Sequence, residues 1–569
     1  MGKDSICYQM NRQGGTAGQA ILKEFREICK DPGRVSEELL MKILRDNEDT
    51  EYGRKYNFRD IGSVKEYREN VPVITYDDID GSIERMKAGE KNILTAYKFT
   101  HMNETSGTVG KQKAVPLTEE QTKVFMKYSN QITLGVLTEA FGESWMEGRS
   151  FSPSEGNART LDSGITVGCA SSIMAKACRG GLEPYSSMLK GMYTSPPEAM
   201  LPGPGINTRY MHTRFAMADR EVTGITGGFM SNILHLMMYI HDNYELLIND
   251  IESGTINPEI EMPDDIRESL LKRIEPMPER AAELREIFRN GPDIPFMPLV
   301  WPKMLYISAV GGDGFKVYDD TMKAHYHGGK IHTVYAGVTA SEGLWSVPIA
   351  VDDMDSVLVP DSAFMEFLPV EAGDDFSQVR SIDELEEGKI YELIITNLCG
   401  FYRYRMSDAV KVTGFEGRTP KIQFMYRVNK TINLACEKTT EAALMHTAQK
   451  VSERLGFELM DYEVYPDQNS VPGKYIFMIE TPNEKRFDIS REELCKAVLE
   501  ELREANPEFG ECYDESLIQA PDAWFEEPET QMLYRDLMIF KGASSSQFKA
   551  VHVISNEQQA NFFLGMREK

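Results

Sequence analysis

The sequence has few cysteines, and none of them lies close to another along the chain. The eight cysteines occupy positions 7, 29, 169, 178, 399, 436, 495 and 512, so no two of them form a C-x-x-C pair. This scatter excludes a zinc knuckle and a disulfide framework. The residues that follow Met1 lead into polar rather than apolar sequence, so we expect no secretory leader. The pattern predicts a cytoplasmic protein with reduced thiols.

Long apolar runs and an excess of positive charge are also missing. The longest apolar stretch, around residues 233–240, contains His235 and is too short to cross a bilayer. The chain has 62 basic and 89 acidic residues, which gives a formal net charge of −27. Such a chain repels the backbone of a nucleic acid and the surface of an anionic membrane. We therefore expect no nucleic-acid partner and no membrane partner.

No internal repeat or low-complexity tract is visible in the 569 residues. The length exceeds what one core usually serves, and 41% of the residues are hydrophobic, so we expect two or more domains. Apolar spacing at 20–29 and 37–45 predicts helices in the N-terminal part. Between residues 299 and 359, short apolar strands mixed with glycine-rich turns are typical of an α/β sheet.

One short run combines hydroxyls, glycines and lysines in a way that suits a phosphate group. It reads Thr105-Ser106-Gly107-Thr108-Val109-Gly110-Lys111-Gln112-Lys113. Glycines allow successive N–H groups to face one anion, while hydroxyls and lysines add donors and charge. The spacing is not that of a Walker A loop, because Gln112 follows Gly110-Lys111. On this segment alone, a surface turn beside two solvated lysines is an equal alternative.

The run resembles the phosphate signature T-S-G-T-T-G-x-P-K of the adenylate-forming superfamily, and six of the eight specified positions agree. Val109 and Gln112 are the departures. The resemblance implies that Thr105, Ser106, Gly107, Thr108 and Lys113 bind the phosphates of ATP.

A second run identifies the family more closely. Residues 401–415, FYRYRMSDAVKVTGF, resemble the Y-R-Y-R-x-G-D-V-V-x-V-T-G-F block of the Gretchen Hagen 3 family of acyl acid amido synthetases. Residues 47–52, 71–79, 364–369 and 437–441 also resemble segments of that family. The resemblance extends from about residue 20 to the C-terminus and is weakest after about residue 455.

The family resemblance places the nucleoside at Asp408. One carboxylate can accept hydrogen bonds from both ribose hydroxyls, which suits recognition of a nucleoside. A loop aspartate that caps a turn is the alternative. Ser407 stands where the family has glycine, and if that position needs a positive φ, serine strains the loop. Arg427 resembles the arginine that joins this aspartate at the ribose, and a surface arginine is its alternative.

Residues 339–343, TASEG, resemble the second motif of the family. There Ser341 would contact a phosphate and Glu342 would approach Mg²⁺. A single carboxylate is adequate, because magnesium usually takes one or two protein carboxylates beside phosphate oxygens. A solvated loop glutamate is the alternative. Val338 replaces the aromatic residue that often packs on adenine; Tyr335 could substitute for it or could be a buried strand residue.

Near the C-terminus, residues 542–549, GASSSQFK, resemble a family segment whose lysine enters the active site when the small domain closes. Lys549 would neutralise charge while a carboxylate oxygen attacks the α-phosphorus of ATP. The P-R pair that usually follows is absent, so a solvated lysine is a serious alternative.

The resemblance also implies the domain organisation. We expect an α/β protein whose large N-terminal adenylate-forming domain, residues 1–427, contains mixed β-sheets flanked by helices. Residues 428–569 would form a smaller, mobile α+β domain. The local pattern agrees with this, because it predicts helices at 440–455 and 490–504 and strands at 461–465 and 475–479.

The expected activity is an ATP- and Mg²⁺-dependent ligase that adenylates a small carboxylic acid and transfers the acyl group to an amine, most simply an amino acid. Glu342 and Lys549 would be its catalytic residues. An acyl-CoA ligase is one alternative, although the chain lacks the P-K-T-x-S-G-K tail motif of those enzymes. A degenerate, non-catalytic nucleotide or acid sensor is the other, motivated by Val109, Val338 and Ser407.

Overall fold

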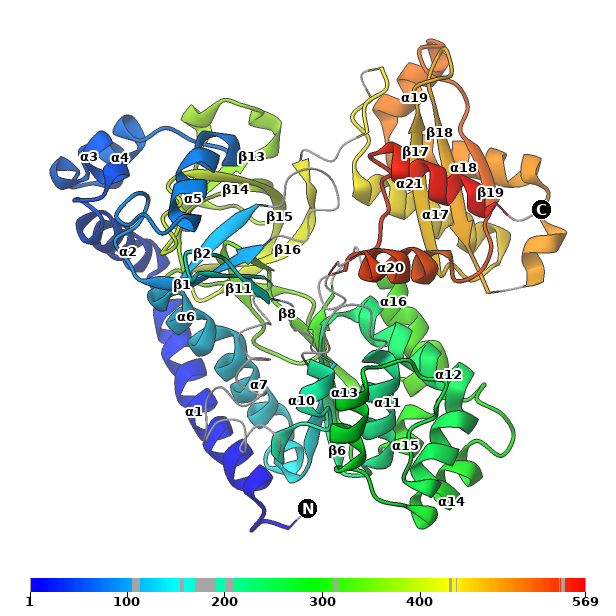
Figure 1. The fold of residues 1–569 in the computed structure, drawn as a ribbon. Helices are drawn as coiled ribbons and strands as arrows, with labels where there is room; N and C mark the ends of the chain where they lie inside the picture. The colour runs from blue at the N-terminus through cyan, green and yellow to red at the C-terminus, as the bar shows by residue number, and fades with distance from the viewer. Residues whose placement is uncertain are drawn as a thin grey trace.

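The computed structural model describes residues 2–104, 113–153, 158–168, 191–200, 208–311, 316–428, 432–435, 437–482, 484–541, 543 and 548–567. Figure 1 shows a main body, residues 2–428, and a C-terminal lobe, residues 437–567, that lies to one side of it. The expected α/β class is confirmed, because the body and the lobe both combine sheets with helices. The helices of the described ranges include none long and apolar enough to cross a membrane.

The N-terminal part of the body is helical, as the apolar spacing predicts. Helix α1 (Ile6–Ile28) begins where the Ser5 side chain accepts a hydrogen bond from the Tyr8 N–H. It packs along α7 (Ile132–Phe141), and the two helices touch at Gly18 and Gly135. A Cβ at Gly18 would lie 2.5 Å from the Gly135 nitrogen, so only glycine permits this approach. Four further helices follow α1: α2 (Pro32–Asp46), α3 (Glu51–Lys55), α4 (Val64–Asn70) and α5 (Asp80–Lys87).

In the part of the body that the structure describes, three sheets have four or more strands. The first has the order β2-β1-β5-β4: β1 (Phe99–Glu104), β2 (Ala114–Thr118), β4 (Ala158–Thr160) and β5 (Thr166–Gly168). The second is antiparallel, with the order β11-β12-β16-β15-β14-β13: β11 (Ser346–Val347), β12 (Ser356–Leu358), β13 (Phe364–Pro369), β14 (Ile390–Thr396), β15 (Tyr404–Glu416) and β16 (Thr419–Arg427). Its apolar face packs against the N-terminal helices.

The third sheet is parallel and supports most of the remaining helices. Its order is β3-β6-β7-β8, with β3 (Arg149–Phe151), β6 (Val222–Phe229), β7 (Tyr306–Val310) and β8 (His332–Ala336). The helices around it in Figure 1 are α10 (Pro197–Met200), α11 (Thr208–Ala218), α12 (Met230–Ser253), α13 (Asp264–Leu271), α14 (Pro278–Ile287), α15 (Met297–Val300) and α16 (Lys316–Thr321). Ligands of parallel sheets bind at the carboxyl ends of the strands. In β6, β7 and β8 these ends are Phe229, Val310 and Ala336.

Helix α6 (Glu119–Phe125) begins after Thr118, which caps it. The Thr118 hydroxyl accepts the Gln121 N–H, so the first helical turn has a side-chain partner. The helix continues through a π-helical segment (Met126–Gln131) into α7. The π-helical turn lies opposite α1 and leaves Met126 exposed.

The C-terminal lobe has the predicted alternation of helices and strands. Helix α17 (Glu441–Leu455) is capped by Thr440 and α18 (Arg491–Ala505) by Ser490. The strands β17 (Asp461–Asp467) and β18 (Lys474–Glu480) are antiparallel, and β19 (Asp522–Phe525) runs parallel to β18. The remaining helices of the lobe are α19 (Pro507–Asp514), α20 (Thr530–Phe540) and α21 (Glu557–Phe563). The sequence predicts α17, α18, β17 and β18 to within two residues.

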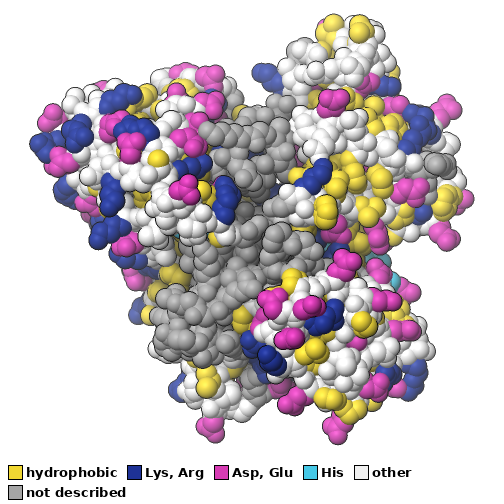
Figure 2. All heavy atoms as spheres, viewed as in Figure 1, with side chains coloured by type: hydrophobic (Ala, Val, Ile, Leu, Met, Phe, Trp, Pro, Cys, Tyr) yellow, Lys and Arg dark blue, Asp and Glu magenta, His cyan; other side chains and the backbone are white. Residues whose placement is uncertain are grey.

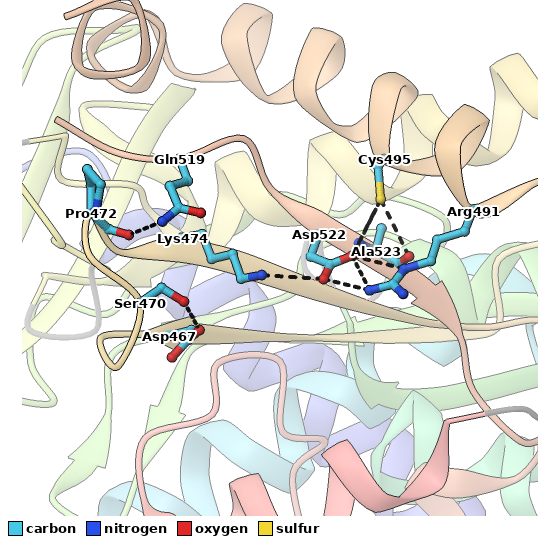
Figure 3. A network of polar contacts seen from close by, with 9 residues as sticks. All are labelled: Asp467, Ser470, Pro472, Lys474, Arg491, Cys495, Gln519, Asp522 and Ala523. Carbon is cyan, nitrogen blue, oxygen red and sulfur yellow. Dashed lines mark hydrogen bonds and ion pairs between the residues drawn. The ribbon is translucent and has the colours of Figure 1, made fainter. Parts of the chain in front are cut away.

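Asp522 ties helix α18 to the sheet of this lobe (Figure 3). Arg491 donates to Asp522 at 2.6 Å, Lys474 lies 3.5 Å from the same carboxylate, and the Cys495 sulfur accepts the Ala523 N–H at 3.1 Å. Burial raises the pKa of the Cys495 thiol, so it stays protonated at neutral pH. The described cysteines, at positions 7, 29, 399, 495 and 512, form no disulfide with one another.

On the face shown in Figure 2, the described surface mixes charges of both signs and has an apolar region. Figure 2 shows acidic and basic side chains interspersed over the visible face of the body and the lobe. Apolar side chains gather over α20, where Leu533 and Phe540 are exposed. This helix faces the main body, and its Asp536 pairs with Arg209 of α11.

Candidate functional site

Asp408 and Arg427 face each other across the hairpin of β15 and β16. They are direct partners in the antiparallel register, which explains their separation of 19 residues along the chain. Arg427 Nε donates to Asp408 Oδ1 at 2.9 Å. The Asp408 carboxylate is buried, Arg427 is partly exposed, and the carboxylate raises the pKa of the guanidinium. The pair therefore presents a fixed carboxylate beside a permanent positive charge.

Ser407 has the backbone conformation that its position in the motif implies. Its φ is +60°, in the left-handed region that glycine adopts without penalty. The register explains why: Arg405 pairs with Ile394 and Ala409 with Glu392, so β15 has extra residues between these pairs. The resulting bulge turns Asp408 toward β16. The expected strain at serine is thus present, at roughly 1 to 2 kcal/mol for a residue with a Cβ.

Ser341 and Glu342 form the tip of a small hairpin between β9 (Thr339–Ala340) and β10 (Gly343–Leu344). Two asparagine side chains hold this tip. Asn103 of β1 donates to the Ser341 carbonyl at 3.0 Å, and Asn397, just after β14, donates to the Glu342 carbonyl at 2.8 Å. The hairpin is therefore fixed to both neighbouring sheets.

The Glu342 side chain is buried in an electrostatically mixed environment. Burial raises the pKa of its carboxyl, and the nearby Asp408 raises it further, whereas Arg427 and Lys113 oppose these effects. Each of these groups acts on Glu342, so the structure brings four of the predicted residues into one site. A solvated loop glutamate is excluded, because only 6% of Glu342 is exposed.

Lys113 closes the same site from the start of β2. Its Nζ donates to the Tyr404 hydroxyl at 3.1 Å and lies 5.4 Å from the centroid of the Tyr76 ring. Glu104 and Ala114, which flank the glycine-rich run, pair in the antiparallel register. Thr105, Ser106, Gly107 and Thr108 lie outside the described residues.

Lys549 approaches the body from the C-terminal lobe. Its Nζ lies 5.2 Å from the centroid of the Phe229 ring, at the carboxyl end of β6. The register places Phe229 level with Val310 of β7, and Val310 level with Ala336 of β8. The chain leaves β8 toward Glu342. Lys549 thus stands at the sheet edge that leads into the site, whereas Asp408, Arg427, Glu342 and Lys113 form its centre.

Arg403, in the run 401–415, has a structural role that the sequence did not indicate. Arg403 is buried, donates to Glu366 at 2.9 Å and also donates to the Val71 carbonyl at 2.9 Å. Its partners belong to the segments 364–369 and 71–79, which resemble the family as well. Three distant stretches with a family resemblance therefore meet at one buried guanidinium. This ion pair supports the strand that carries Asp408.

Tyr335 is a buried strand residue in this structure. Its hydroxyl donates to Asp319 at 2.9 Å, and only 8% of the residue is exposed. A Cβ on Gly311 would lie 2.5 Å from the ring, so the tyrosine packs directly on the backbone after β7. The sequence analysis did not predict a role for three residues that contact the site, Asn103, Asn397 and Tyr404. Tyr404 lies inside the family-like run, whereas the asparagines carry no local signal.

The donor set of the site fits Mg²⁺. A hard cation takes one or two carboxylates together with phosphate oxygens, and it would offset both the burial of Glu342 and the repulsion from Asp408. Within the described ranges, no three His, Cys, Asp or Glu side chains are arranged to hold a metal. Phosphate oxygens and water would therefore have to supply the remaining ligands.

Family models match most of the chain. The model of the GH3 family N-terminal domain matches residues 21–331, that of the central domain residues 356–427, and that of the C-terminal domain residues 438–558. The central model ends at Arg427, and it includes the hairpin with Asp408.

Plant proteins and a solved structure are similar over most of their length. Indole-3-acetic acid-amido synthetase GH3.2 of Arabidopsis thaliana is 27% identical, with 84% of this chain and 90% of the relative covered. Jasmonoyl–L-amino acid synthetase GH3.5 of Oryza sativa subsp. japonica is 25% identical, with coverage of 81% and 82%. The structure of GH3.15 acyl acid amido synthetase superposes with a TM-score of 0.84 at 21% identity and covers 97% of both chains. That likeness establishes the fold.

Proposed function

The chain belongs to the GH3 family, and we propose that it is an ATP-dependent, AMP-forming acyl acid amido synthetase. It would join a small carboxylic acid to an amine, most simply the α-amino group of an amino acid. The observation that carries the proposal is the grouping of two cations, Arg427 and Lys113, around the buried carboxylates of Asp408 and Glu342. The similar plant proteins, whose names give indole-3-acetic acid and jasmonoyl conjugation, support the class of reaction.

The first half-reaction activates the acid. A carboxylate oxygen attacks the α-phosphorus of ATP, the bond between the α-phosphorus and its bridging oxygen breaks, and pyrophosphate leaves with the electron pair. Asp408 accepts the ribose hydroxyls, and Arg427 holds Asp408 in place. Lys113 and the run 105–108, together with Ser341, bind phosphate oxygens. Mg²⁺, held by Glu342, would neutralise phosphate charge.

The second half-reaction forms the amide. The amine nitrogen attacks the acyl carbon of the adenylate, AMP leaves with the electron pair of the broken C–O bond, and the nitrogen loses a proton. The mixed anhydride is reactive enough that no covalent enzyme intermediate is required. The domains that we assign are residues 1–427, which bind ATP and the acid, and residues 428–569, which rotate between the two steps.

Lys549 has its role in the first step. Its ammonium, brought to the carboxyl edge of the parallel sheet, stabilises the charge that develops as the carboxylate meets the α-phosphate. Replacing Lys549 by alanine should slow acid-dependent exchange of pyrophosphate into ATP by roughly 10²-fold, the scale at which a preorganised electrostatic contact contributes. Amide formation from a presynthesised acyl-adenylate should remain nearly intact.

Lys541→Ala is the matched control, because this exposed lysine follows α20 in the same lobe. It should leave both half-reactions unchanged. Equal losses of both half-reactions in Lys549→Ala would indicate a folding defect, and no loss in either would place Lys549 on the solvated surface. Formation of a thioester with coenzyme A in place of an amide would instead favour an acyl-CoA ligase.

A further inference from the structure

The chain segment after Lys549 is clamped onto the first strand of the C-terminal lobe. The His552 carbonyl accepts the Val464 N–H at 2.8 Å, and the Ile554 N–H donates to the Val464 carbonyl at 3.0 Å. Val551 is held as well, because its carbonyl accepts a hydrogen bond from the Gln531 side chain at 3.0 Å. The position of Lys549 is therefore set by the orientation of this clamped segment.

His552 is a buried, charged residue of the segment that follows Lys549. Burial alone would lower the pKa of its imidazole, but hydrogen bonds with Asp461 and Glu441 outweigh burial and raise the pKa to about 10. His552 Nε2 lies 3.0 Å from Asp461 Oδ1, and the ring stacks on Tyr462 with centroids 4.7 Å apart. At neutral pH the segment thus carries an imidazolium paired with carboxylates of the same lobe.

A side chain of the main body enters this ion pair. Tyr318, on helix α16, donates its hydroxyl hydrogen to Asp461 Oδ2 at 2.7 Å, and the hydroxyl oxygen lies 3.3 Å from His552 Nε2. Burial and the adjacent carboxylate raise the pKa of Tyr318 well above its ordinary value, so the hydroxyl stays protonated and donates. Only 2% of Tyr318 is exposed. A body residue therefore completes a charged network that otherwise belongs to the lobe.

The segment from Lys549 to His552 contacts the main body at two places, which lie beside neighbouring strands of the parallel sheet. Lys549 lies over Phe229, at the end of β6, and His552 meets Tyr318, on the helix that follows β7. Two separated points fix a rotation as well as a position. Two further polar links between the described parts of body and lobe, Arg209 with Asp536 and His325 with Glu458, include more exposed side chains and are screened by water.

We propose that Tyr318 is a positioning residue for adenylation: its hydroxyl docks on the Asp461–His552 pair and thereby holds the lobe in the orientation that presents Lys549 at the carboxyl edge of the sheet. This inference rests on the proposed function, because Lys549 must act in the first half-reaction. The docked orientation has to be left again before the amine can react. The two orientations must therefore be close in free energy, and one buried hydrogen bond to a charged acceptor shifts their populations measurably.

The test removes the hydroxyl alone, with Tyr318→Phe. Acid-dependent pyrophosphate exchange should lose at least fivefold in kcat, while the KM for ATP stays within twofold because Tyr318 is not part of the nucleotide site. Amide formation from supplied acyl-adenylate should be unchanged or faster, since the second step uses another orientation. Small-angle X-ray scattering of the free protein should show a larger radius of gyration than the parent protein has.

Tyr210→Phe is the matched control, because Tyr210 donates to Asp250 at 2.6 Å in a buried tyrosine–aspartate pair wholly within the body. It should lower stability without altering the ratio of the two half-reactions or the scattering. Unchanged exchange in Tyr318→Phe, or equal losses in both half-reactions with parental scattering, would overturn the inference. If the parent protein itself shows no exchange with any acid, the proposed function fails, and the scattering comparison alone decides whether Tyr318 docks the lobe.

Discussion

Asp408→Asn tests the nucleoside site with little change in side-chain shape. The asparagine oxygen can still accept from Arg427 Nε, which now donates to Asp408 at 2.9 Å. What is lost is the negative charge and one of the two acceptors for the ribose hydroxyls. Hydrogen bonds to a charged group contribute about 1.5 to 3 kcal/mol, so the Kd for ATP should rise by roughly 10- to 150-fold.

Stability should change much less than affinity in this variant. Arg427 is 44% exposed, so water screens its pairing with Asp408, and the loss should stay below about 1 kcal/mol. Isothermal titration calorimetry gives the Kd, and urea denaturation gives the free energy of unfolding. Opposite behaviour is expected of the control Glu392→Gln, which removes the buried charge of Glu392 on β14 that pairs with Arg405 of β15, the strand that carries Asp408.

The control should be clearly less stable at unchanged ATP affinity, because Glu392 is 2% exposed and its loss leaves Arg405 without its buried partner. An unchanged Kd in Asp408→Asn would refute the ribose assignment. The same would follow if Glu392→Gln weakened ATP binding as much as Asp408→Asn does, because general softening of the sheet would then explain both.

Three further predictions concern the site and the lobe. Ser407→Gly should relieve about 1 to 2 kcal/mol of strain at φ +60°, less roughly 0.5 to 1 kcal/mol for the greater freedom of glycine in the unfolded chain, so ATP binding stays equal or tightens; a clear loss in calorimetry would give the serine a role of its own. Because burial raises the pKa of Glu342 and the cation needs its ionised form, the affinity for Mg²⁺-ATP should weaken as pH falls through that pKa. Glu342→Gln should bind Mg²⁺-ATP more weakly, and its affinity should depend less on pH. An affinity that depends on pH as it does in the parent protein would show that Glu342 does not hold the metal. Burial, followed by Asp461, raises the pKa of Glu480 from 4.5 to about 8, so the folded state holds a proton that the unfolded state has lost. Stability should then fall as pH rises from about 4.5 to 8, and urea denaturation of Glu480→Gln should show a shallower fall, whereas an identical slope would contradict the assignment.

Local signals account for what the sequence predicted well. Thr440 and Ser490 each cap a predicted helix through a side-chain oxygen that accepts an N–H three residues on, and such signals lie within one window of sequence. The motif also marked Ser407 as a position where a positive φ would strain serine, and the structure has that φ. Asp408 and Arg427 pair because one hairpin connects them, so their short spacing preserved the signal.

Contacts between segments that are distant in the sequence have no comparable local signal. Tyr318 meets residues 143 and 234 positions away, and no period or cap marks it in the sequence. Asn397 supports Glu342 only because two sheets bring their ends together. The identity of such residues depends on the tertiary fold, which periodicity does not encode. The division at residues 427 and 428 stays a prediction, as do the roles of the site residues.

Acid-dependent exchange of labelled pyrophosphate into ATP is the most direct measurement of the central claim. The panel would include indole-3-acetic acid, a jasmonate and 2,4-DB, the acids in the names of similar proteins. We predict exchange that requires Mg²⁺ and at least one acid, with AMP released only after an amino acid is added. Absence of exchange with every acid, in a folded protein that binds ATP, would contradict the account and favour a non-catalytic sensor.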